Sequence, residues 1–137
     1  MKLGILCYPS SGGSGVLASE LGAALASRGH DVHVFSYRLP FRMQPTPERL
    51  RFHEIKVPSY PLFEFPSYGM AAACAMAQAT REHGLDVIHA HYAFPHGVSA
   101  HLAKDILSTD EPPRSVKSVV TLHGTDVLLV EQDPGLN

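Results

Sequence analysis

Three short stretches of the sequence carry groups that could bind an anionic ligand. The first is a run of small residues, Ser10 to Gly15, between an apolar segment and an amphipathic one. Its glycines would let a ligand approach the backbone closely, and the N-terminus of a following helix would attract a phosphate or a carboxylate. The second stretch is His89-Ala90-His91-Tyr92, and the third is His123-Gly124-Thr125-Asp126. Both place polar side chains at the end of an apolar run, which is typical of the edge of a sheet where ligands bind.

The elements that must position these stretches alternate between strand and helix. Apolar and β-branched runs predict five strands, over residues 3–8, 31–37, 51–57, 86–92 and 118–122. Helical spacing and alanine content predict three helices, over residues 16–28, 70–83 and 95–107. Strands and helices in this alternation predict an α/β domain with a doubly wound, Rossmann-like parallel sheet.

The first predicted helix carries an apolar stripe and an end signal. Large or aliphatic side chains recur at three- and four-residue spacing and are expected to face the core: Val16, Leu17, Leu21, Ala24 and Leu25. Arg28 and Gly29 follow, and a glycine at this place is typical of a helix C-terminus.

In a sheet of this kind the ligand lies beyond the C-terminal ends of the strands. That rule gathers four segments at one edge: Ser10 to Gly15, Leu39 to Arg42, His91-Tyr92 and His123 to Asp126. We therefore expect one site built from segments that are far apart in the sequence.

Composition narrows the class of protein. A chain of 137 residues with 45% hydrophobic and 18% charged residues is expected to form one globular domain over residues 1–137. A net charge of −2 argues against a nucleic-acid binder that depends on a basic surface. No apolar run is long enough to cross a membrane and no signal peptide is evident, so we expect no membrane contact and a cytoplasmic location. Cys7 and Cys74 are expected to be buried, reduced thiols.

The glycine run also allows a dinucleotide interpretation. Gly13, Gly15 and Ala18 satisfy the relaxed dinucleotide fingerprint. The second strand ends without the acid that would bind a ribose, but Arg38 follows it and could accept a 2′-phosphate. An NADP-type binding module therefore remains an alternative.

Metal binding and dimerisation rest on weaker patterns. His89 and His91 share one face of a strand and could chelate a metal, but the sequence places no third ligand and contains no Asp-x-Asp pair. We therefore expect no metal in the site and metal-independent chemistry. The aromatic loop from Pro58 to Tyr68 could pack over the sheet edge or form a contact surface, which leaves a homodimer open.

Four sequence motifs, taken together, resemble those of a known protein family. They are Cys7-Tyr8-Pro9-Ser10-x-Gly12-Gly13-Ser14-Gly15, Leu39-Pro40-Phe41-Arg42, His89-Ala90-His91-Tyr92-Ala93-x-Pro95-His96 and Thr121-Leu122-His123-Gly124-Thr125-Asp126. With them, the whole chain resembles the N-terminal half of a retaining glycosyltransferase of family four with the GT-B fold. The resemblance implies transfer of GlcNAc from UDP-GlcNAc to the hydroxyl of L-malate, the first step of bacillithiol synthesis. It also implies a C-terminal domain that holds the nucleotide sugar, so this chain is expected to be the acceptor-side half and inactive alone.

The resemblance assigns three residues to the donor. It implies that the backbone N–H groups of Gly12 and Gly13 approach the donor phosphate. His123 is expected to act as the catalytic residue, by contacting the transferred sugar near its 6-hydroxyl.

Four further residues are assigned to the acceptor. Ser14 is expected to bind a malate carboxylate, and Tyr92 and Thr125 to complete the acceptor seat. Arg42 is expected to meet the charge of the acceptor.

Overall fold

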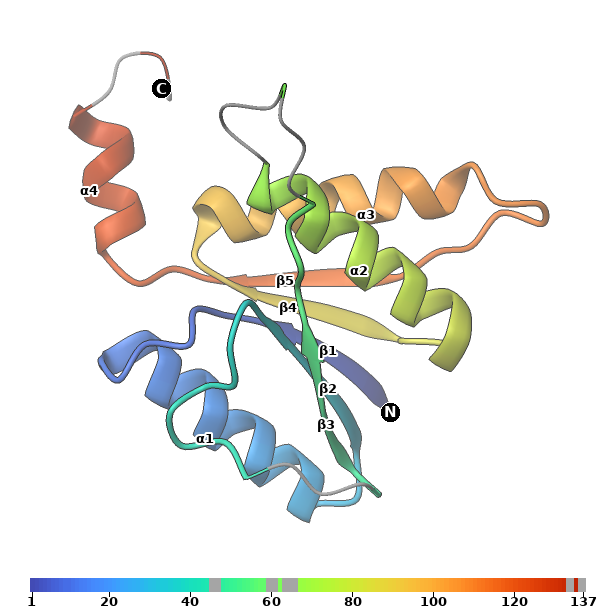
Figure 1. Ribbon diagram of the computed structural model, residues 1–137, viewed down its shortest axis with the longest axis horizontal. Coiled ribbons are helices and arrows are strands. Elements are labelled where there is room, and N and C mark those ends of the chain that lie inside the picture. Colours follow the sequence, from blue (N-terminus) through green and yellow to red (C-terminus); the bar gives the residue numbers. More distant parts are fainter. Residues whose placement is uncertain (45–47, 59–61, 63–66, 133–134, 136–137) are drawn as a thin grey trace.

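Five parallel strands form one sheet at the centre of the molecule (Figure 1). The computed structural model describes residues 1–44, 48–58, 62, 67–132 and 135. The strands are β1 (Lys2–Leu6), β2 (Asp31–Ser36), β3 (Leu50–Glu54), β4 (Val87–His91) and β5 (Lys117–Thr121). Their order is β3-β2-β1-β4-β5, so the direction of winding reverses between β1 and β4. Ligands bind at such a reversal in open α/β sheets, and the loop after β1 begins there.

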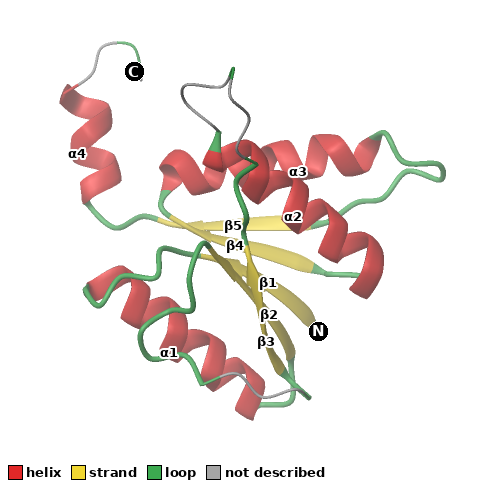
Figure 2. Ribbon diagram, viewed as in Figure 1, coloured by secondary structure: helices red, strands yellow, loops and turns green. Residues whose placement is uncertain are grey.

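Helices lie on both faces of the sheet (Figure 2). They are α1 (Gly13–Ser27), α2 (Tyr68–His83), α3 (Val98–Ser108) and α4 (Thr125–Gln132), with a π-helical turn η1 (Ala93–Gly97) before α3. Helix α1 covers one face, and α2 and α3 pack side by side on the other. The predicted doubly wound, Rossmann-like α/β fold is confirmed. None of the helices described has the length and apolarity to cross a membrane.

The two faces of the sheet carry separate hydrophobic cores. Side chains alternate across a strand, so neighbouring residues enter different cores. Buried residues on the α1 side include Ile5, Cys7, Ala18, Val32 and Val34. Buried residues on the α2 and α3 side include Leu6, Phe35, Met76, Ile88 and Ala90.

Helix α1 turns a different face to the sheet from the one predicted. Its buried residues are the small ones, Gly15, Ala18, Ser19 and Gly22, whereas the side chain of Leu17 is 51% exposed. Small residues bring the helix close to the sheet: a Cβ on Gly22 would lie 3.5–3.6 Å from side chains of β1, β2 and β3. The expected stripe was therefore wrong for Leu17 and Ala24, which are exposed, because close packing here selects small side chains, whereas Leu25 does pack against the core on this side. The predicted left-handed Gly29 is confirmed, with φ +87°.

The segment after β4 also differs from prediction. A helix was expected from residue 95, but α3 begins at Val98, after η1. Phe94 has φ −124° and ψ 130°, which interrupts helical geometry ahead of Pro95. Helix α4 was not predicted at all.

One of the two cysteines is placed differently from expectation. Cys7 is buried, and burial raises the pKa of its thiol to about 12. Cys74 is exposed, because α2 buries the opposite face, with Ala73, Met76 and Ala77. The expectation of two buried thiols was therefore wrong for Cys74.

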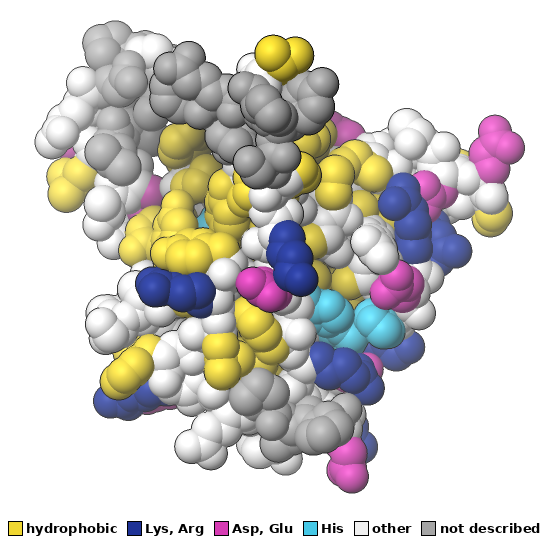
Figure 3. Space-filling view, viewed as in Figure 1, with side chains coloured by type: hydrophobic (Ala, Val, Ile, Leu, Met, Phe, Trp, Pro, Cys, Tyr) yellow, Lys and Arg dark blue, Asp and Glu magenta, His cyan; other side chains and the backbone are white. Residues whose placement is uncertain are grey.

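Charged side chains of both signs are mixed over the surface. On the face shown in Figure 3, lysine and arginine side chains (dark blue) are scattered among acidic ones (magenta). Several arginines are paired with carboxylates, among them Arg51 with Asp31 at 2.5 Å and Arg81 with Asp110 at 2.7 Å. Most of the aromatic loop considered for dimerisation lies outside the described residues, as do residues 45–47.

Candidate functional site

The glycine run forms the loop between β1 and α1, and it leaves the N-terminus of α1 open. The first intrahelical bond runs from the Val16 N–H to the Gly12 carbonyl, at 3.2 Å. Gly12 is the N-cap residue and has no side chain to cap the helix, and the first turn holds no acidic residue. The N–H groups of Gly13, Ser14 and Gly15 therefore stay available, at the positive end of the helix dipole, for an anion.

Glycine occupies three positions of this loop for different structural reasons. A Cβ on Gly15 would lie 2.8 Å from the carbonyl oxygen of Tyr8, and closer still to that of Ser10, so the fold itself requires glycine there. A Cβ on Gly12 or Gly13 would meet no atom within 4 Å. The fold does not need glycine at these two positions, so their lack of a side chain instead keeps the backbone open to a ligand.

Alanine substitution separates the two kinds of glycine. Gly15→Ala is expected to lower the free energy of unfolding by about 1–3 kcal/mol, because backbone must move to admit the methyl group. Gly12→Ala and Gly13→Ala, the matched controls, are expected to change it by less than about 0.5 kcal/mol. Urea unfolding of the three variants measures this, and equal stabilities would contradict the close contact at Gly15.

Tyr92 joins the end of β4 to this loop. Its hydroxyl donates to Ser14 Oγ at 2.9 Å, across 78 residues of sequence. Its backbone has φ 81°, a conformation that costs a non-glycine residue about 1–3 kcal/mol and persists where surrounding contacts enforce it. The ring is held by Tyr8 and His123, whose centroids lie 5.6 and 4.7 Å away. The strained backbone aims the phenol at the N-terminus of α1.

A pair of imidazoles lies beside Tyr92. His91 Nδ1 and His123 Nε2 are 2.9 Å apart, so one donates a hydrogen bond to the other. Burial lowers the pKa of His91 to about 4, helped by the neighbouring imidazoles of His89, His123 and His96. His91 is therefore neutral at pH 7 and orients the ring of His123 without adding charge.

Asp126 ties the two halves of this region together. Its carboxylate is 2% exposed and accepts from the Ala93 N–H at 2.7 Å and the His123 N–H at 2.9 Å. Burial raises the pKa of Asp126, but backbone N–H donors, including that of Val127, outweigh burial and hold it below its usual range. One carboxylate thus fixes the turn after Tyr92 to the segment that carries His123.

An open cleft of about 550 Å³ collects most of the predicted site residues. Its lining comes from three of the four expected segments: Ser10, Gly12, Gly13, Ser14, Leu17, Tyr92 and His123. In Figure 1 the start of α1 and the start of α4 lie at the same end of the sheet. The cleft is the expected edge beyond the C-terminal ends of the strands.

Two predicted site residues lie outside this cleft lining. Thr125 is exposed at the start of α4, with its N–H bonded to the His123 carbonyl. Arg42 is exposed and pairs with Glu20 on α1 at 2.5 Å. The structure does not bring Arg42 to the cleft, because the segment after β2 turns toward the outer surface of α1. Its role toward the acceptor stays a prediction, one that would require Arg42 to leave Glu20.

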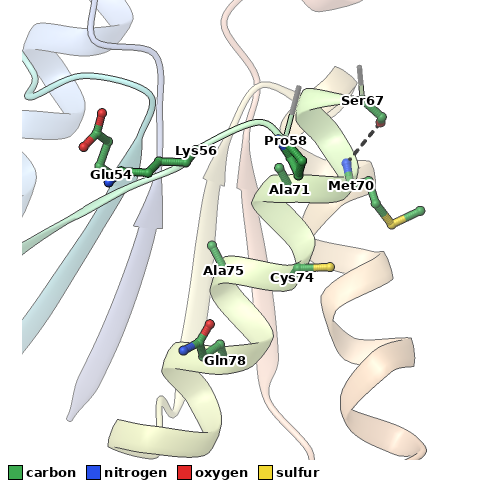
Figure 4. Close-up of a pocket in the computed structure, with 9 residues that line it drawn as sticks. All are labelled: Glu54, Lys56, Pro58, Ser67, Met70, Ala71, Cys74, Ala75 and Gln78. Carbon is green, nitrogen blue, oxygen red and sulfur yellow. Dashed lines mark hydrogen bonds between the residues drawn. The ribbon is translucent and has the colours of Figure 1, made fainter. Parts of the chain in front are cut away.

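A second hollow, of about 470 Å³, lies between α2 and the segment after β3 (Figure 4). Most of its α2 side is formed by Ala71, Cys74 and Ala75. The N-terminus of α2 is capped by its own sequence, since Ser67 Oγ accepts from the Met70 N–H at 3.2 Å. This end therefore lacks the uncapped first turn that favours an anion at α1.

Sequence reasoning missed the groups that position the site. The contact of Asp126 with the Ala93 N–H joins two segments that are far apart in the sequence. His96 is fully buried, and its Nδ1 lies 2.7 Å from the His91 carbonyl oxygen. His89 is half-buried and bonded to Thr121 at 2.7 Å. Spacing along the chain carries no signal for such contacts between segments.

Curated relatives match this chain closely in sequence. N-acetyl-alpha-D-glucosaminyl L-malate synthase of Bacillus anthracis is 44% identical over 137 residues, which is 100% of this chain and 35% of that protein. An uncharacterised glycosyltransferase of Methanocaldococcus jannaschii is 35% identical over 75 residues, 55% of this chain and 19% of that protein. The chain thus spans about a third or less of the length of these relatives.

Solved structures share the fold of this chain, and a family model identifies its family. A glycosyltransferase from Rickettsia africae superposes with a TM-score of 0.61 at 18% identity, over 87% of this chain and 28% of its own. Sucrose-phosphate synthase from Thermosynechococcus elongatus gives 0.63 at 17% identity, over 95% of this chain and 35% of its own. Residues 11–136 match the model of Glycosyltransferase Family 4. The chain belongs to glycosyltransferase family 4.

Proposed function

We propose that this chain is the acceptor-side part of an enzyme that transfers GlcNAc from UDP-GlcNAc to the hydroxyl of L-malate with retention of configuration. The 44% identity to a protein named as an L-malate synthase supports the choice of substrates. The observation that carries the proposal is the hydrogen bond between Tyr92 and Ser14, at the open N-terminus of α1. It sets two hydroxyl groups beside an anion-binding backbone, which suits a small hydroxy acid.

The donor diphosphate is assigned to the glycine side of the cleft. Gly12 and Gly13 line it without side chains that would hold a ligand away. The N–H groups of the first turn would stabilise negative charge as it develops on the departing diphosphate. Because backbone N–H groups supply this stabilisation, it does not require a bound metal ion.

The acceptor is assigned to the other side of the cleft. A malate carboxylate would accept from the Ser14 hydroxyl and from the first turn of α1, and the Tyr92 hydroxyl, by donating to Ser14 Oγ, would turn the Ser14 hydroxyl proton toward that carboxylate. His123, placed by His91 and Asp126, would contact the sugar near its 6-hydroxyl. Thr125 would reach the acceptor from the start of α4.

Retention follows if the acceptor attacks from the face that the diphosphate leaves. A bond forms between the malate hydroxyl oxygen and the anomeric carbon as the carbon–oxygen bond to the phosphate breaks. The malate hydroxyl proton passes to the departing phosphate oxygen. The side chains of the cleft then contribute position and charge stabilisation, which supply much of the rate enhancement in such reactions.

The rest of the donor site is assigned to a C-terminal domain, as the relative lengths suggest. We therefore propose that this chain alone is inactive and that the full-length gene product is metal-independent. Another acceptor within the family is the closest competing proposal, and a panel of hydroxy acids, inositol phosphates and sugars separates the two. Titration with UDP and NADPH tests the dinucleotide alternative, which tight NADPH binding would revive.

Two conservative variants of the full-length product test the acceptor assignment. Ser14→Ala and Tyr92→Phe are expected to raise KM for malate by roughly 10-fold or more, because the first removes a hydrogen bond to a charged ligand and the second removes the donor that orients the Ser14 hydroxyl. KM for UDP-GlcNAc is expected to stay within about twofold, since neither change touches the glycine side. Steady-state kinetics with each substrate varied in turn measures both constants.

Matched controls lie elsewhere on the same chain. The Ser27 hydroxyl donates to the Ala24 carbonyl at the far end of α1, and Tyr37 is 40% exposed. Ser27→Ala and Tyr37→Phe are expected to leave both KM values unchanged. Unaltered malate saturation in Ser14→Ala and Tyr92→Phe would show that the acceptor assignment is wrong.

A further inference from the structure

Three histidines from three different elements converge away from the cleft. His33 lies in β2, His53 in β3 and His83 at the end of α2. One ring nitrogen from each lies within 4.8 Å of the other two. His33 Nδ1 and His53 Nε2 are 2.8 Å apart, a distance at which only one of them can carry a proton. The other nitrogen accepts this hydrogen bond with its lone pair, so at least one imidazole lone pair faces into the cluster.

The cluster lies on the α2 side of the sheet, away from the end that holds the cleft. His33 pairs with Gly4 of β1 near the middle of the strand, and α2 ends here because it runs back along the sheet. His33 is fully buried, whereas His53 and His83 are half-buried, so one side of the cluster reaches solvent. Histidine side chains gather in one patch on this face (cyan in Figure 3).

Carboxylates lie around the three rings as they do around bound metals. Ligating histidines usually direct the second ring nitrogen at a carboxylate or carbonyl group. His33 Nε2 lies 3.5 Å from Asp31 Oδ1, on the side of the ring opposite to Nδ1. His83 Nε2 lies 3.8 Å from Glu82 Oε2. Arg51 Nη1 is paired with Asp31 at 2.5 Å and also lies 3.2 Å from His33 Nε2, outside the cluster.

We propose that His33, His53 and His83 form a binding site for a divalent transition metal of the zinc type. Imidazole nitrogens favour zinc, cobalt, nickel and copper over magnesium or calcium. Tetrahedral zinc with bonds of about 2.0–2.1 Å sets its ligands about 3.3 Å apart, so the observed separations need only side-chain adjustment. Water takes the fourth position. The metal cross-links β2, β3 and the end of α2, and it takes no part in the chemistry at the cleft.

Cobalt titration of the tag-free chain tests this site. Tetrahedral Co²⁺ absorbs visible light, so the titration reports coordination as well as affinity. We expect saturation at one Co²⁺ per chain and displacement of the bound cobalt by Zn²⁺. His53→Gln and His83→Gln are each expected to weaken binding by roughly 100-fold or more, since even outer partners of a metal ligand are worth 10- to 100-fold.

His101 supplies the matched control. It is an exposed histidine on α3 whose recorded contact is Asp105, at 3.6 Å. His101→Gln is expected to bind Co²⁺ as the unsubstituted chain does. Thermal unfolding in the presence of a chelator verifies that each variant is folded. If His53→Gln does not fold, the Co²⁺ affinity of His83→Gln decides whether the proposal stands. Absence of saturable binding, or binding that His83→Gln leaves intact, overturns the proposal.

Discussion

Asp126→Ala is expected to lower the free energy of unfolding by about 3 kcal/mol. The substitution leaves the N–H groups of Ala93 and His123 buried without their acceptor, and each such loss costs about 1–3 kcal/mol. The stability of Asp126→Asn is expected to lie between those of Asp126→Ala and the unsubstituted chain, because its amide keeps one acceptor oxygen and turns an NH₂ group toward the other donor. Urea unfolding at pH 7 measures all three proteins.

Activity of the full-length product is expected to fall further than stability alone explains. Without Asp126 the turn after Tyr92 and the segment of His123 can move apart, and a misplacement of about 1 Å can cost roughly 100-fold in rate. The expected loss is therefore roughly 100-fold in kcat/KM, measured at a temperature where both proteins are folded.

An exposed acid provides the control for Asp126. Asp105 on α3 is 63% exposed and pairs loosely with His101. Asp105→Ala is expected to change stability by less than about 0.5 kcal/mol and to leave the rate unchanged. A stability of Asp126→Ala equal to that of Asp105→Ala would mean that the two backbone bonds find other acceptors.

The strands and the edge that binds ligands could be predicted because local patterns encode them. Val32, Val34 and Phe35 of β2, for example, place apolar side chains on both faces, as is typical of a strand covered on both faces. The Ser10 to Gly15 run then follows a strand and opens a helix, which gave the location of the cleft. The close packing of α1 was beyond this reasoning, because Gly15 and Gly22 add nothing to an apolar stripe.

Contacts between distant segments were the second feature that could not be predicted from the sequence. Tyr92 and Ser14 were both predicted as site residues, but nothing in their spacing indicated that they bond each other. Arg42 shows the opposite case: its segment follows the C-terminal end of β2, yet Glu20 holds its side chain on the outer face of α1. The edge rule locates backbone ends, and the direction of a side chain depends on its neighbours.

Acidification from pH 8 to pH 5 is expected to remove several kcal/mol of stability through His33, His91 and His96. Burial lowers the pKa of each to about 4, from 6.5 in the unfolded chain. Between these values the unfolded chain binds more protons, so stability is present above pH 6.5 and is lost as the pH falls toward 4. The expected loss at pH 5 is on the order of 2 kcal/mol from each histidine, a large part of the 5–15 kcal/mol of a typical domain.

Removing one of these titrations is expected to reduce the loss of stability between pH 8 and pH 5 by the share of one histidine, on the order of 2 kcal/mol. His96→Asn replaces the imidazole by an amide that can still donate to the His91 carbonyl, so the variant loses the proton uptake while keeping the contact. His101→Gln removes an exposed histidine instead and is expected to keep the full dependence. Urea unfolding at pH 8 and pH 5 gives the two slopes. Parallel curves for His96→Asn and the unsubstituted chain would contradict the assignment. Asp31, Asp110 and Asp126 have lowered pKa values and therefore titrate at still lower pH. The change in stability between pH 8 and pH 5 is thus expected to come from the histidines.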